Sequence, residues 1–138
     1  MSRLIKTSSA GKDRLLFEKG IVYAIHELSE QSHMDENTRD LLAYIALSLL
    51  AINDTIDQSV AAWEKRGYWV KADRYRMDWN WAGTLGESLK NSITSEDWAA
   101  AVNIIGKVTQ KLSNVKIAQR NRMGSPWVGS HKKIIRSD

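Results

Sequence analysis

Apolar residues recur along this chain at steps of three and four positions. This spacing places them on one stripe of an α-helix, which can then pack against other helices. Val, Ile and Thr do not cluster in alternating runs, so no strands are expected. The pattern predicts four helices, over about residues 12–32, 35–66, 68–92 and 95–122.

Residues at the ends of these segments support their boundaries. Asp35 is a suitable N-cap for the second helix, and Gly67, which follows Lys65 and Arg66, is a suitable C-cap. Thr94-Ser95-Glu96-Asp97 resembles a capping box and predicts the start of the fourth helix. Gly124-Ser125-Pro126 predicts its end.

The predicted fold class follows from the short connections between the long helices. Helices joined by two or three residues must fold back on their neighbours to bury their apolar stripes. We therefore expect an all-α, antiparallel up-and-down four-helix bundle over residues 1–123, followed by a basic C-terminal tail, 124–138, with no fold of its own. One continuous helix through Gly67 would span about 90 Å at 1.5 Å per residue, and we regard it as the weaker alternative.

Length and composition restrict the protein classes. A chain of 138 residues that is 43% hydrophobic suits a single domain with a real core. It has no cysteine, which suits a reducing compartment. The N-terminus has no apolar signal region, and the longest apolar stretch, 41–52, is too short to cross a membrane. We expect a cytoplasmic protein with no membrane partner.

Basic residues are concentrated at the two ends of the chain. Residues 107–138 hold eight Lys or Arg against one acid, and residues 1–20 hold five against two. Such segregation predicts an anionic partner, most often RNA or DNA. The candidate nucleic-acid-binding residues are Lys107, Lys111, Lys116, Arg120, Arg122, Trp127, Lys132, Lys133, Arg136, Arg3 and Lys6.

Aromatic residues cluster between positions 63 and 81, interleaved with Lys and Arg, a combination that can stack bases and neutralise phosphates. Most of these aromatic residues also match the helical stripes, so packing explains them equally well. Trp69 and Trp81 lie off the stripe. Two exposed indoles need cover, so we predict a homo-oligomer interface at Trp69 and Trp81.

Two carboxylate pairs suggest an enzymatic alternative. Glu27 and Glu30 on the first helix, with Asp54 and Asp57 on the second, resemble the acidic pairs with which all-α nucleotide pyrophosphatases hold Mg²⁺. However, Asp54 points about 200° away from its helix's apolar stripe, which favours a solvated acidic face.

The sequence contains no complete motif for the other catalytic sites that we considered. The single Glu-x-x-His motif, Glu30 to His33, lacks the second copy that a di-iron bundle needs. No serine has a recognisable base and orienting acid. We expect no enzyme and no cofactor. A scaffold that docks on an acidic protein surface is a further alternative.

Four short motifs fall in the third and fourth predicted helices. They are Lys71-Ala72-Asp73, Trp79-Asn80-Trp81-Ala82, Trp98 followed by Ile104-Ile105-Gly106-Lys107 and Leu112, and Arg120-Asn121-Arg122-Met123-Gly124. Over roughly half the chain, this pattern resembles the accessory variability determinant proteins of diversity-generating retroelements and their relatives encoded in ribosomal-RNA intervening sequences.

The resemblance implies a basic homo-oligomeric barrel, typically a pentamer, that binds structured RNA and the element's reverse transcriptase without a catalytic site. At Asn80 and Thr84 this chain departs from the family, which tends to place Arg there. The resemblance carries over only the general positions of Lys107, Lys111, Arg120 and Arg122. We therefore expect a non-catalytic, RNA-binding accessory protein of a reverse transcriptase.

Overall fold

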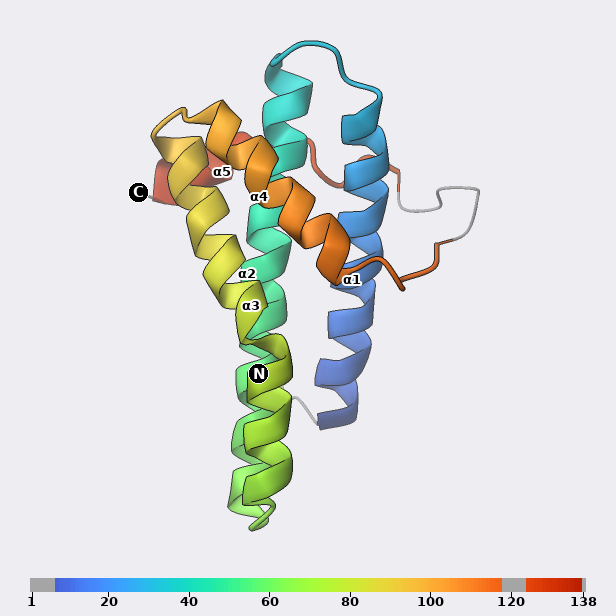
Figure 1. The fold of residues 1–138 in the computed structure, drawn as a ribbon, viewed down its shortest axis with the longest axis vertical. Helices are drawn as coiled ribbons and strands as arrows, with labels where there is room; N and C mark the ends of the chain where they lie inside the picture. Colours follow the sequence, from blue (N-terminus) through green and yellow to red (C-terminus); the bar gives the residue numbers. More distant parts are fainter. Residues whose placement is uncertain (1–6, 118–123, 138) are drawn as a thin grey trace, which may run out of the picture.

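The computed structural model describes residues 7–117 and 124–137, and within these ranges the chain is all-α with no strand (Figure 1). This confirms the predicted all-α class. None of the described helices is both long enough and apolar enough to cross a membrane. The helices are α1 (Thr7–Ser29), α2 (Glu36–Lys65), α3 (Trp69–Thr94), α4 (Trp98–Lys111) and α5 (Ser130–Ser137).

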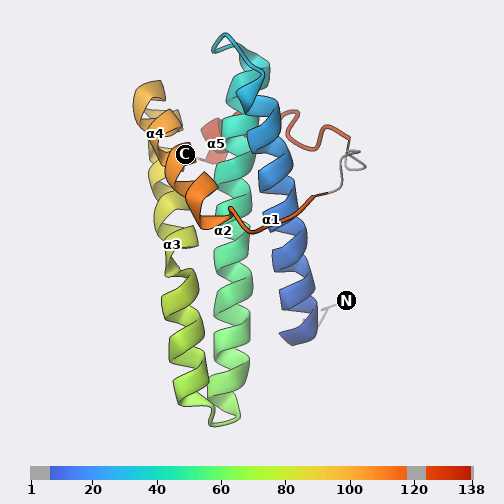
Figure 2. The same cartoon turned by 45° about the vertical axis from the view of Figure 1, so that its right-hand side comes forward.

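Helix α2 is the centre of the molecule. It lies between α1 and α3, which both run antiparallel to it (Figures 1 and 2). Its apolar stripe, which includes Leu41, Ile45, Leu49 and Ile52, is fully buried. Helix α2 buries apolar residues against both α1 and α3. Each added turn contributes apolar area to the core, which favours a long α2.

The ends of α2 form as the sequence predicts. Asp35 is the N-cap, and its carboxylate accepts a hydrogen bond from the Thr38 backbone N–H at 2.9 Å. At the other end Arg66 is the C-cap, and the predicted cap residue Gly67 follows it with a φ of 83°, a conformation that costs glycine little, where the chain reverses into α3. The second and third segments are therefore separate helices, and the long continuous helix does not form.

Helices α2 and α3 approach each other closely at Gly86. A Cβ atom at this position would lie 3.1 Å from the Leu49 Cβ and 3.1 Å from a methyl carbon of Leu50. The missing side chain lets the two helix backbones come together, so the antiparallel pair packs tightly along this part of its length.

Arg14 of α1 contacts two aromatic residues of α3. The Arg14 Nε lies 3.2 Å from the Glu18 carboxylate, which is buried. The same guanidinium donates a hydrogen bond to the Tyr75 hydroxyl and lies 5.0 Å from the centre of the Trp79 ring. These contacts satisfy a charge that would otherwise be costly to bury.

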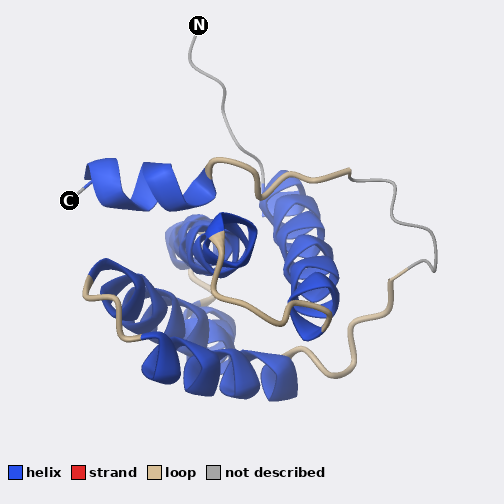
Figure 3. Ribbon diagram, turned by 90° about the horizontal axis from the view of Figure 1, so that it is seen from above, coloured by secondary structure: helices blue, strands red, loops and turns tan. Residues whose placement is uncertain are grey.

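The fourth predicted helix is wrong at both ends. Helix α3 continues to Thr94, because Ser92 and Ile93 are buried, and the N-cap of α4 is Asp97. Helix α4 ends at Lys111, with Leu112 as its C-cap. It is therefore short, and it crosses obliquely from the end of α3 towards α1 (Figures 1 and 3). The predicted full-length fourth helix does not form.

The predicted tail without a fold of its own is also wrong. Residues 130–137 form α5, which packs against α2 (Figure 3). Trp127 and Ile134 are buried and belong to the same hydrophobic core as the long helices. The described part of the chain thus consists of three long antiparallel helices with two short helices packed on them.

Candidate nucleic-acid interface

The N-terminus of α5 is held by a buried acid on α2. Asp40 is 6% exposed, and its two carboxylate oxygens accept hydrogen bonds from the backbone N–H groups of Gly129, at 3.1 Å, and His131, at 3.0 Å. The first N–H groups of a helix have no partner within the helix, and a negative charge is favourable there. These two hydrogen bonds compensate the cost of burying the Asp40 carboxylate, and they fix the start of α5.

Trp127 and Ile134 complete this attachment through apolar contacts. The Trp127 indole is 5% exposed, and its Nε1 donates a hydrogen bond to the Asn37 side-chain oxygen at 3.1 Å. Ile134 is fully buried, and the His131 Nδ1 lies 3.3 Å from a Glu36 carboxylate oxygen. Trp127 is thus a core residue, and its prediction as a nucleic-acid-binding residue is wrong.

The basic side chains of α5 lie on its outer side. Lys132, Lys133 and Arg136 are exposed, and none forms an ion pair with an acid in the described part of the chain. Lys132 and Arg136 lie one turn apart, each about 200° around the helix from the buried Ile134. Packing of Ile134 against the core therefore turns two cations directly outwards, with Lys133 beside them.

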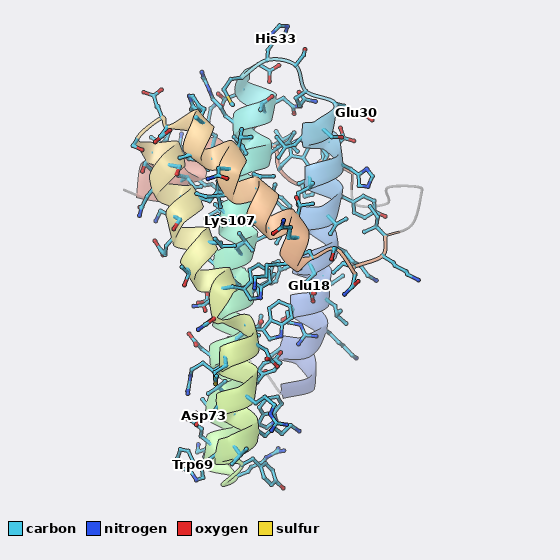
Figure 4. All side chains as sticks on the ribbon, in the orientation of Figure 1. Glu18, Glu30, His33, Trp69, Asp73 and Lys107 are labelled. Atoms are coloured by element: carbon cyan, nitrogen blue, oxygen red, sulfur yellow. The ribbon has the colours of Figure 1, made fainter. Side chains whose placement is uncertain are left out.

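Helix α4 presents a second basic group. Lys107 and Lys111 are exposed one turn apart, and Lys107 is labelled beside α4 in Figure 4. The Lys111 ammonium is 6.0 Å from the centre of the Trp81 ring. Lys116 is also exposed, after the helix has ended. Lys107 and Lys111 flank the buried stripe of Ala101, Ile104 and Val108, so they lie at the edge of the packed face of α4.

The two basic groups do not form one surface. Seen along the long axis, α4 and α5 lie on opposite sides of α2 (Figure 3). Arg3, Lys6, Arg120 and Arg122, which are also predicted contacts, lie outside the described residues. The sequence places the C-terminal cations in one stretch, but the fold divides those it describes between two faces.

The two tryptophans predicted at an oligomer interface differ in exposure. Trp69 is 60% exposed at the turn between α2 and α3, at the end of the molecule labelled in Figure 4. Trp81 is half-buried, and its ring stacks on that of Trp79 with centres 5.6 Å apart. Intramolecular packing therefore covers part of Trp81, and the homo-oligomer interface stays a prediction.

The four carboxylates of the enzymatic alternative are not brought together. Glu27 and Glu30 lie near the end of α1, beside the start of α2, whereas Asp54 is 18 residues further along α2 than Glu36, or about 27 Å along the helix axis. Across residues 7–117 and 124–137, no three His, Cys, Asp or Glu side chains are grouped as a metal site. The antiparallel register separates the pairs that the pyrophosphatase interpretation needs.

Sequence reasoning missed the residues that organise the C-terminal segment. Glu36, Asn37 and Asp40, on the first turns of α2, contact residues about 90 positions away. No spacing within α2 indicates those contacts. Lys71 and Arg74 belong to the cations that the sequence interleaves with the aromatic cluster, and the structure places them beside Trp69 around a hollow at the α2–α3 turn.

Comparison with known proteins gives no relative for this chain. No protein-family model, curated protein or solved structure matches it. The resemblance to the accessory variability determinant family therefore stays a prediction from the sequence.

Proposed function

We propose that this protein is a non-catalytic nucleic-acid-binding protein, with RNA as its expected ligand. The observation that carries the proposal is helix α5. Its outer side presents Lys132, Lys133 and Arg136, while Asp40, Trp127 and Ile134 hold its inner side on the core. Cations on a docked helix lose less conformational freedom on binding than cations on an unstructured tail.

Contacts of this kind recognise the backbone of a nucleic acid. Lys and Arg bind phosphate oxygens and release the counterions condensed on the strand, which gives affinity without base specificity. Lys107 and Lys111 on α4 form a separate group on the other side of the molecule, available to a second strand or a second turn of the same ligand. We place the principal contact on α5 because its three cations occupy five consecutive positions.

The test compares two pairs of lysines. Lys132→Ala/Lys133→Ala removes two cations from α5, and Lys12→Ala/Lys19→Ala removes two exposed cations from α1. Binding of a fluorescently labelled RNA duplex is measured by anisotropy over a range of salt concentrations. Each lost phosphate contact lowers the slope of log affinity against log salt by about 0.7–0.9. We expect the α5 variant to lower the slope by about 1.4–1.8 and the α1 variant to leave it unchanged.

Equal effects of the two variants would reject α5 as the contact surface, since they would show attraction by net charge alone. Absence of RNA and DNA binding by the unaltered protein would reject the proposed function. The reverse transcriptase partner, the pentameric assembly and the cytoplasmic location stay predictions from the sequence.

A further inference from the structure

The turn between α2 and α3 projects beyond the described part of α1 (Figures 1 and 2). A hollow of about 650 Å³ opens there, between the last turn of α2 and the first turns of α3. Its aromatic lining consists of Trp63, Tyr68, Trp69 and Tyr75. Trp63 and Tyr75 pack edge to face, with ring centres 4.9 Å apart, so they form a fixed wall.

The other two aromatic rings of the hollow are exposed. Trp69 is 60% exposed and Tyr68 is 55% exposed. Neither belongs to the hydrophobic core, although the partly buried Trp63 and Tyr75 pack against it. Adjacent exposed aromatic residues offer flat apolar surfaces on which a planar ligand can stack.

The charges around the hollow favour an anionic ligand. Arg76 pairs with Glu64 at 3.3 Å and with Asp73 at 3.2 Å, so its single charge offsets part of the negative charge of these two acids. The charged residues that line the hollow are Lys71, Arg74 and Asp78, so the lining has a net positive charge. The Lys71 ammonium lies 4.6 Å from the centre of the Trp63 ring. This ammonium group would repel a cationic ligand, whereas it would attract a phosphate.

The start of α3 adds to this preference. Tyr68 is the N-cap of α3 but makes no side-chain hydrogen bond to the first turn, and that turn contains no acid. The helix therefore presents the positive end of its dipole beside Lys71, and its own first turn contributes no acid to offset it.

We propose that this hollow binds an unpaired nucleotide of a single-stranded nucleic acid. The base stacks on Trp69 and Tyr68, and the adjoining phosphates contact Lys71 and Arg74. The inference rests on the proposed nucleic-acid binding and adds a site that distinguishes single strands from duplexes. Inside a duplex both faces of each base are already stacked and the base is paired, so only an unpaired base can enter the hollow.

The experiment compares Trp69→Ala with Met77→Ala. Met77 is 74% exposed on the same helix and does not line this hollow, so its variant controls for loss of an exposed apolar side chain. Affinities for a labelled single-stranded RNA and for a blunt RNA duplex of the same sequence are measured by anisotropy. Thermal unfolding of each variant verifies that the fold is kept.

We expect Trp69→Ala to weaken binding of the single strand by about 5- to 150-fold, the range found for a lost aromatic stack, and to leave duplex binding unchanged. Trp69→Phe retains a stacking ring and should lose less. Lys71→Ala/Arg74→Ala should lower the salt slope for the single strand by about 1.4. Met77→Ala should behave as the unaltered protein.

An unchanged single-strand affinity in Trp69→Ala, or an equal loss for both ligands, would overturn the inference. So would a nucleoside monophosphate that binds as tightly as the strand, because the ligand would then be a free nucleotide. A lower native mass of Trp69→Ala with intact strand binding would assign the surface to a second copy of the chain. Duplex binding that still depends on Lys132 and Lys133 would preserve the proposed function in each of these cases.

Discussion

Replacement of Asp40 by Ala should release helix α5 from an otherwise intact bundle. The Asp40 carboxylate accepts hydrogen bonds from the Gly129 and His131 backbone N–H groups at 3.1 and 3.0 Å. Hydrogen bonds to a charged group contribute about 1.5–3 kcal/mol each. The freed N–H groups can bond to water once α5 moves, so we expect a net loss of about 2–4 kcal/mol in the free energy that holds α5.

Hydrogen exchange measures this loss directly. Since about 1.4 kcal/mol corresponds to a factor of ten, amides of α5 should exchange about 30 to 1,000 times faster in Asp40→Ala. Amides in the middle of α1 should keep their rates, because α1 packs on a different side of α2 (Figure 3). Exchange followed by mass spectrometry of peptides from both helices separates local release from global unfolding.

Two further variants sharpen the interpretation. Asp54→Ala removes an exposed acid from the same helix and should leave α5 unchanged. Asp40→Asn keeps one acceptor oxygen and should cost less than Asp40→Ala. Unaltered exchange of α5 in Asp40→Ala, or an equal rise in α1 and α5, would refute the assignment of Asp40 as the residue that fixes this helix.

Three further predictions concern the core and its pH dependence. Trp127→Ala should lower the free energy of urea unfolding by about 3–5 kcal/mol, since it removes a buried indole; a loss below 1 kcal/mol would show that the segment is held elsewhere. Arg14→Met should cost about 2–4 kcal/mol by leaving Glu18 buried without its partner, and the double variant Arg14→Met/Glu18→Leu should be more stable than Arg14→Met. Hydrogen bonds from the Thr38 backbone N–H and hydroxyl lower the pKa of Asp35. Its contribution to stability is therefore present above the unfolded value of about 3.9 and is lost as the pH falls through the lower folded pKa, so Asp35→Asn should flatten stability curves measured below about pH 4.

Cap chemistry explains why α2 could be predicted from the sequence. The Asp35 cap and the Gly67 reversal each depend on residues within three or four positions, which a local pattern contains. The start of α4 could not be chosen on the same grounds, because Thr94 and Asp97 are both good N-caps. Burial of Ser92 and Ile93 extends α3 to Thr94 and leaves the cap to Asp97. Packing of α3 against the core therefore determines which of the two possible N-caps, Thr94 or Asp97, begins α4.

The C-terminal segment shows a different limit. Helix α5 has eight residues, too few to reveal a helical period, and its N–H partner Asp40 lies 89 to 91 positions earlier. An isolated helix of that length is not stable, so its formation depends on docking against α2. Trp127 stands among cations in the sequence and so suggested base stacking, whereas its hydrogen bond to Asn37 places it in the core.

The separation of the two proposed contacts predicts how binding depends on ligand length. Asp40, where α5 is attached, and Trp63, in the hollow, are 23 residues apart on α2, which corresponds to about 35 Å along its axis. A stacked strand advances about 3.4 Å per nucleotide, so about ten nucleotides are needed to reach both. Shorter single strands can occupy only one contact, while longer ones gain the second at a high effective concentration. We therefore expect affinity to rise steeply near this length in the unaltered protein and gradually in Trp69→Ala. A gradual rise in both proteins would mean that one ligand does not connect the two ends of the molecule.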